Sequence, residues 1–393
     1  MRRIKFQIAI IILLFILLPL TTKAQSVTYF GRIVDSETES PIPFAHLSLV
    51  GTNIGTVSNE EGYFSIKSSL RDSVPLSVSS IGYNTSTTVL NNNQIDQGLK
   101  IRLEPNAIEL NEILISAEPE SAKEILTQAY LRIPQNYFLK EHMITGYHKE
   151  SENTNNEPIY IIEEIIEAQV PEKSSEDKIK IYQLKSRKKE LQNVKKFKID
   201  YKRGGAYGRV NSSIRTPRRS MRPDEMKRYT YSIDGYSVYN DRPVVIISIT
   251  DSKKRKPYSG KFTIDLESYA YIRIERNKVH GDSMPTDDWK WTNHSRVEHF
   301  VQEDNGMWRL NSSSYVGKWI KKKTKQEFQY KEIYVTTGFS EEVNLSSTGT
   351  EFNYHDELYE NVSSDFDPSF WGKYNYIKLN EAEENALKSI NKQ

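Results

Sequence analysis

The chain has 393 residues, of which 37% are hydrophobic and 27% are charged, and it contains 24 tyrosines. This length suits two domains, and the composition is that of a folded chain rather than a disordered one. The formal net charge of +2 gives no support for a nucleic-acid partner. The chain lacks cysteine, which excludes disulfides, thiolate metal sites, a cysteine nucleophile and a lipidated N-terminal cysteine.

Residues 1 to 24 have the pattern of a secretory signal peptide. A basic start with Arg2, Arg3 and Lys5 precedes the apolar run IAIIILLFILLPL, and the small residue Ala24 stands before the expected cleavage point. A transmembrane anchor is the alternative, but the run is short for a membrane-spanning helix. We therefore expect an exported mature chain without a transmembrane helix.

Residues 25 to 105 predict a small β-sandwich. Short alternating runs such as VTYFGRIVD, YFSIKS and LKIRLEP are separated by Gly, Pro, Asn and Asp. Alternation with period two is typical of half-buried strands, and these four residue types favour turns. About seven such strands in so short a stretch indicate two packed sheets.

The segment GTNIGTVSNEEGYFSI contains three polar residues directly before Gly62, which raises the question of a calcium loop or a catalytic pair. If Gly62 were the sixth position of an EF-hand loop, Val57 would hold the first position, which requires an oxygen ligand. Glu60 and Glu61 are adjacent, so they point to opposite sides of an extended chain and cannot act as a pair. We predict a tight turn with Gly62 at positive φ.

The stretch GRIVDSETESPIPFAHLSLVGTNIGTVSNEEGYFSI, with SSIGY after it, resembles the carboxypeptidase-like regulatory domain. This is a transthyretin-like sandwich of envelope proteins in Gram-negative bacteria, and the resemblance covers residues 26 to 105. It implies an interaction or folding module and brings no catalytic residue. The matching positions are Gly31, Asp35, Pro43, Ala45, Val50, Thr56, Gly62, Phe64 and the IGY of residues 81 to 83.

Residues 106 to 120 are predicted to be a linker with one strand-like run, EILIS. Ser121 and Glu124 then form a capping box that begins a helix, and Pro134 ends it. Residues 121 to 393 are expected to hold this helix and a larger antiparallel β domain.

The second domain is predicted from about ten further alternating runs, with a short helix over residues 381 to 390. The run PIYIIEEIIEA also fits a helical stripe, but its β-branched content favours a strand. GKFTIDLESYAYIRIERN has a strand–turn–strand pattern similar to that of outer-membrane lipoprotein carriers, which fold as a curved sheet. The fold class is therefore mainly β: a transthyretin-like sandwich followed by a larger antiparallel sheet, open or closed to a half-barrel, with few short helices.

The motifs of common enzymes are missing from the sequence. None of the seven histidines has a Glu three residues later, which excludes the carboxypeptidase zinc pattern, and there is no HExxH, GxSxG or phosphate-loop motif. His294 and His299 lie five residues apart, hence on opposite faces of a strand, and we expect both at the surface. We predict no enzyme, no catalytic, cofactor-binding or metal-binding residue, and no cofactor.

Two basic stretches and four tryptophans leave alternatives open. Residues 185 to 205 and 215 to 228 fit a solvated insertion, or contacts with anionic lipid headgroups or polysaccharide, and residues 202 to 210 fit a flexible loop. The tryptophans suit a groove for sugar or lipid and suit sheet packing equally. They are Trp289, Trp291, Trp308 and Trp319.

These observations favour a non-enzymatic binding or scaffold protein of the cell envelope, with the sandwich as its interaction module. We expect it in the periplasm or at either surface of the outer membrane, with an envelope protein, polysaccharide or lipid as partner. The alternative is a periplasmic carrier that shelters a lipid or glycolipid in the curved sheet near residues 258 to 277. An unrecognised hydrolase is a remote third hypothesis.

Overall fold

The computed structural model describes the chain in segments. The signal-peptide prediction lies outside them, as does nearly all of the predicted linker. The described residues are 26–68, 73–91, 98–106, 120–155, 157–175, 178–197, 204–251, 258–280, 288–344, 349–362, 371–372 and 374–390.

The N-terminal part is a sandwich of two small sheets, as predicted. One sheet has the strand order β4-β1-β7 and the other β3-β2-β5-β6. Their facing side chains form one core that includes Tyr29, Ile33, Leu47 and Phe64, all fully buried. The strands are β1 (Val27–Asp35), β2 (His46–Leu49), β3 (Gly55–Val57), β4 (Tyr63–Ser68), β5 (Val74–Ser79), β6 (Ser86–Leu90) and β7 (Leu99–Leu103).

The turn predicted before Gly62 is confirmed. Gly62 has φ +78°, and its amide donates to the Asn59 carbonyl at 3.0 Å. The Asn59 side-chain oxygen accepts from the amides of Glu61 and Tyr63 at 3.0 and 2.9 Å. A Cβ at Gly62 would lie 2.5 Å from the Ile33 carbonyl oxygen, so both the conformation and the space require glycine.

The second part is built on one sheet of eleven strands, in the order β11-β12-β13-β14-β15-β16-β17-β8-β9-β10-β18. Every neighbouring pair is antiparallel, and the ambiguous run PIYIIEEIIEA lies within a strand. The strands are β8 (His142–Thr154), β9 (Glu157–Val170), β10 (Lys180–Glu190), β11 (Tyr229–Tyr239), β12 (Arg242–Asp251), β13 (Tyr258–Asp265), β14 (Tyr271–Val279), β15 (Trp289–Gln302), β16 (Trp308–Lys321), β17 (Glu327–Ser340) and β18 (Thr350–Phe352).

Short helices accompany this sheet. The predicted capping box is present, since the Ser121 hydroxyl accepts from the Glu124 amide and the Glu124 carboxylate accepts from the Ser121 amide. No helix among the described residues is long and apolar enough to cross a membrane. The helices are α3 (Ala122–Leu131), α4 (Ile133–Asn136), α5 (Val194–Phe197), α6 (Tyr207–Val210), η2 (Arg219–Met221), η3 (Pro223–Arg228), α7 (Leu358–Asn361) and α8 (Glu381–Ile390).

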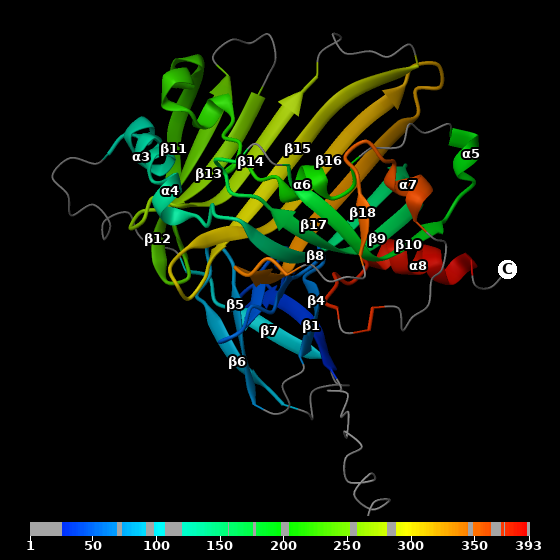
Figure 1. Ribbon diagram of the computed structural model, residues 1–393, viewed down its shortest axis with the longest axis horizontal. Coiled ribbons are helices and arrows are strands. Elements are labelled where there is room, and N and C mark those ends of the chain that lie inside the picture. Colours follow the sequence, from blue (N-terminus) through cyan, green and yellow to red (C-terminus); the bar gives the residue numbers. More distant parts are fainter. Residues whose placement is uncertain are drawn as a thin grey trace, which may run out of the picture.

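The two faces of the large sheet have different covers (Figure 1). We call the face that packs against α3, α6, η2 and η3 the inner face, and the opposite one the outer face. The sandwich lies beneath the curved sheet, and its strand β3 contacts β17 on the outer face. Trp371, Tyr374 and Ile377 pack against the neighbouring part of that face.

The junction between sandwich and sheet is an apolar cluster framed by hydrogen bonds. Val57 of the sandwich packs with Tyr147, Val335 and Trp371, all nearly fully buried. The Asn375 side-chain oxygen accepts from the Lys67 amide at 2.6 Å, and the Asn59 side chain donates to the Lys378 carbonyl at 3.3 Å. The predicted turn therefore serves as a contact between the two parts of the chain.

A charge placed in this junction tests whether it stabilises the fold. Val57→Asp would bury an unpaired carboxylate, and we expect it to lower the free energy of unfolding by about 3 kcal/mol or more. Val50→Asp is the matched control, because Val50 is 51% exposed on the same sandwich. Urea unfolding of both variants measures the effect. Equal unfolding midpoints would contradict the described junction.

Candidate ligand-binding site

Half of the inner face is apolar but already covered by the chain itself. Ile247, Phe262 and Ile274 are fully buried beneath Leu126 of α3 and Met221 of η2. This is the region around residues 258 to 277 where the sequence suggests shelter for a lipid. The space open to a ligand therefore lies elsewhere on the domain.

The centre of the inner face carries buried charge. His148 on β8 stands between two carboxylates: its Nδ1 lies 2.7 Å from Glu164 Oε1 and its Nε2 lies 3.3 Å from Glu332 Oε1. Glu332 Oε2 also lies 3.5 Å from Nε of Arg209, which α6 contributes. Burial alone would lower the pKa of His148, but the hydrogen bonds with Glu164 and Glu332 raise it to about 9. His148 is therefore an imidazolium at neutral pH that compensates two buried acids.

Sequence reasoning missed this buried charge, although the pattern contained a signal. His148, Glu150 and Glu152 alternate along β8, which places all three on one face of the strand. Other carboxylates stand beside apolar residues of predicted strands, in IIEEIIE, RVEHF and YKEIY. A polar residue in such a run is expected to find a partner when buried, but the sequence does not say which.

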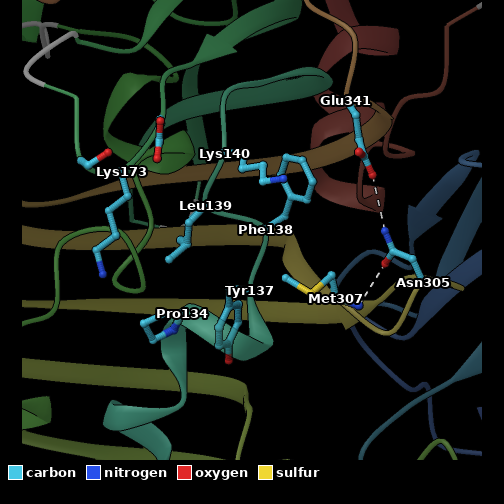
Figure 2. A pocket seen from close by; sticks show the side chains of 11 residues that line it. Pro134, Tyr137, Phe138, Leu139, Lys140, Lys173, Asn305, Met307 and Glu341 are labelled. Atoms are coloured by element: carbon cyan, nitrogen blue, oxygen red, sulfur yellow. Dashed lines mark hydrogen bonds between the residues drawn. The ribbon is translucent and has the colours of Figure 1, made fainter.

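The largest hollow described lies where the strands of the sheet end (Figure 2). Its volume is about 690 Å³, within the range of about 300–1,000 Å³ typical of small-ligand sites. Leu139, Phe138 and Met307 give it apolar walls. Its charged lining residues are two lysines and two acids: Lys140, Lys173, Glu172 and Glu341. Partial burial, and then nearby Arg215, lower the pKa of Lys173.

Four contacts hold this hollow in shape. The Phe138 amide donates to the Trp308 carbonyl at 3.1 Å, and the Lys173 amide donates to the Leu139 carbonyl at 2.9 Å. The Phe138 ring meets the Phe339 ring edge to face, with centroids 5.3 Å apart. Asn305 and Glu341 close one side through the hydrogen bond drawn in Figure 2. The hollow is therefore fixed by two main-chain hydrogen bonds and two side-chain contacts.

His294 and His299 lie on opposite faces of the sheet, as predicted, but neither is fully exposed. His294 pairs with Gly317 on the inner face, where its ring stacks on Tyr315 at a centroid distance of 5.6 Å. His299 points to the outer face, and both side chains are partly buried. Burial, and then the charge of Arg273, lower the pKa of His299 to about 3. The expectation of surface exposure was wrong because the sandwich and the inner segments cover both faces.

The tryptophans serve packing. Trp291 and Trp319 lie 4.9 Å apart between ring centroids, and Trp289 meets Trp319 edge to face at 6.4 Å. Trp308 is 98% buried in the separate core under α3. The sheet-packing alternative is the one that these contacts favour.

The second basic stretch is not a solvated insertion. Met221 and Met226 are buried in the core beside α3, so residues 215 to 228 are folded onto the inner face. The predicted loop at residues 202 to 210 was also wrong, because it contains helix α6 with the buried Arg209. In the first stretch, Arg187 is buried and pairs with Glu163 at 2.8 Å. These segments are folded and not solvated, because apolar residues stand between their basic residues and are buried.

Catalytic and metal-binding residues remain a matter of prediction. The described residues contain no group of three or more His, Asp or Glu side chains placed to hold a metal ion.

Residues 29–115 match the model of the CarboxypepD_reg-like domain. The N-terminal sandwich of this chain is therefore a carboxypeptidase regulatory-like domain, which confirms the resemblance seen in the sequence. No curated protein matches the chain.

Several solved structures are similar to part of this chain at 9% sequence identity. The first is a putative outer membrane lipoprotein-sorting protein domain from Vibrio parahaemolyticus, covering 56% of this chain and 94% of that chain with a TM-score of 0.24. A LolA superfamily protein from Nitrosomonas europaea covers 55% and 94% with a TM-score of 0.22. MucB in complex with MucA(peri) covers 57% and 99% with a TM-score of 0.17. At these scores the likeness carries no argument for function.

The pKa of His148 predicts a pH-dependent stability. Because the folded value of about 9 exceeds the ordinary 6.5, the stabilisation is complete below about pH 6.5 and is lost as the pH rises through 9. This amounts to about 3 kcal/mol of unfolding free energy. We expect His148→Gln to remove that dependence, while His355→Gln, at an exposed position, keeps it. Urea unfolding between pH 6 and pH 9.5 measures both, and a wild-type slope in H148Q would contradict the assignment.

Proposed function

We propose that this chain is a non-enzymatic binding protein of the cell envelope that holds an amphiphilic ligand in the hollow at the strand ends. The observation that carries the proposal is the hollow of Figure 2, with apolar walls at Leu139 and Met307 and ammonium groups of Lys140 and Lys173 at its margin. Such a site accepts an apolar group inside and a polar group at the edge, where Glu172 and Glu341 stand with the two lysines.

The envelope location rests on two features of the chain. The basic start and apolar run of residues 1 to 24 have the pattern of an export signal. The N-terminal domain matches the CarboxypepD_reg-like domain. The resemblance to that family implies an envelope protein. The lack of cysteine is compatible with export, because a chain of this size has a core large enough to fold without disulfides.

The second candidate function is a scaffold that binds an envelope protein. This function is favoured because the sandwich is fixed to the sheet at two places. One is the apolar junction, and the other is the hydrogen bond that the Gly82 amide donates to the Val238 carbonyl at 2.9 Å. A sandwich held at one orientation can present its free side to a partner. Native mass spectrometry of the protein from its own envelope fraction, followed by organic extraction, separates the two. An extractable lipid supports the ligand-binding function, and a bare chain mass supports the scaffold.

A pair of substitutions in the hollow tests the ligand-binding function. We expect Leu139→Gln with Met307→Gln to weaken binding of a fluorescent fatty acid about thirtyfold, because each substitution loses apolar contact worth about 1 kcal/mol. Leu131→Gln is the control, since Leu131 is 56% exposed on α3 and lies outside the hollow. Fluorescence titration measures the dissociation constants. Equal affinities of the double variant and the control would contradict this site.

A further inference from the structure

A second pocket, on the inner face, is lined largely by cationic side chains. It has a volume of about 460 Å³, and we call it the basic pocket. Its cations come from strands, a helix and the segment after it: Arg276 and Lys278 on β14, Arg296 on β15, Arg209 on α6, and Arg218 and Arg219 beside and within η2. Residues distant in the sequence thus bring six cations to one cavity.

The nearby carboxylates do not neutralise these cations. Among the described residues that line the basic pocket there is no Asp or Glu. Glu298 lies beneath it and is shared by Arg276 and Arg296, at 3.4 and 2.6 Å. Glu332, near Arg209, is also bound by His148. The local charge is therefore strongly positive.

Three guanidinium groups of the basic pocket are themselves largely buried. The side chains of Arg209, Arg276 and Arg296 are only 7%, 11% and 12% exposed. The Nε atoms of Arg276 and Arg296 make no hydrogen bond to any described residue, and that of Arg209 has Glu332 Oε2 at 3.5 Å. Desolvated cations with so few partners are costly, so an anion in the pocket would stabilise them.

The titration behaviour of the lining groups agrees with a positive field. Burial lowers the pKa of Arg296 to about 9. The charge of Glu298 acts in the opposite direction, and the charges of Arg209 and Arg276 lower this pKa further. Burial, and then neighbouring His280 and Lys278, lower the pKa of His294 to about 4. An anion in the pocket would reduce this mutual repulsion.

We propose that the basic pocket binds a phosphate group carried by a small ligand. Guanidinium groups bind phosphate oxygens through paired N–H donors, and five arginines can approach a tetrahedral dianion from several sides, whereas a planar carboxylate offers two oxygens. The pocket exceeds the size of phosphate alone, so it has room for the group that bears it beside Tyr258 and Tyr315. This site is independent of the hollow in Figure 2.

The test uses Arg218→Gln with Arg219→Gln in the full chain. Both side chains are exposed at the pocket margin, so the double variant leaves the buried ion pairs intact. Arg222→Gln is the matched control: it lies in the same segment, pairs with Asp224 at 2.6 Å and does not line the pocket. The probes are inorganic phosphate, glucose 6-phosphate, glucuronate, and phosphatidylcholine vesicles with and without phosphatidic acid.

We expect glucose 6-phosphate to bind by calorimetry and to raise the melting temperature, with affinity at least tenfold weaker in the double variant and unchanged in R222Q. Binding of the free ester identifies a soluble ligand, and binding of phosphatidic acid vesicles alone identifies a lipid headgroup; both support the site. Equal affinity in the double variant and R222Q would overturn it. So would glucuronate binding as tight as that of the phosphate ester, or no binding of any phosphate compound.

Discussion

The inner half of the domain depends on the buried carboxylate of Glu298. This group accepts from the Ser213 amide at 2.9 Å and from the Ser213 hydroxyl, and it pairs with Arg276 and Arg296. One carboxylate therefore fastens the segment after α6 to the sheet and holds two guanidinium groups in place. A buried acid of this kind is tolerated only when its partners are complete, so the segment and the arginines are fixed together.

The outer face is held by apolar packing together with a buried ion pair. There the apolar side chains Tyr147 and Val335 need a cover, and the sandwich supplies it with Val57. The buried pair of Glu163 and Arg187 lies at the same place, with the guanidinium group 4.4 Å from the Trp371 ring. Other segments of the chain cover much of each face of the sheet, and the two spaces considered as ligand sites lie at the strand ends and beside η2.

Much of the fold follows from local sequence, because strand alternation and turn residues are short-range signals. The turn at Asn59 and Gly62, the capping box at Ser121 and the strand over IIEEIIE were all predicted this way. The boundaries expected between sandwich, linker and second domain stay predictions. Local patterns also gave the opposite faces of His294 and His299.

The candidate sites follow from contacts that no local pattern contains. Ser213 and Glu298 are 85 residues apart in the sequence, and His148 and Glu332 are 184 apart. The basic stretch of residues 215 to 228 was predicted to be solvated because its many charged residues dominate the sequence pattern. Its position is decided by the burial of its two methionines. Arg209 stood in what looked like a glycine-rich loop, so its burial depended on neighbours brought in from the sheet.

The junction on the outer face also constrains the order of packing during folding. The sandwich precedes the large sheet in the chain, whereas the segment with Trp371 and Ile377 that completes their contact follows it. Until that segment docks, Tyr147 and Val335 are only partly covered, and apolar surface exposed in this way attracts chaperones and other chains. The junction is therefore complete only when all three parts have met, and a chain cut before Trp371 would expose this apolar surface.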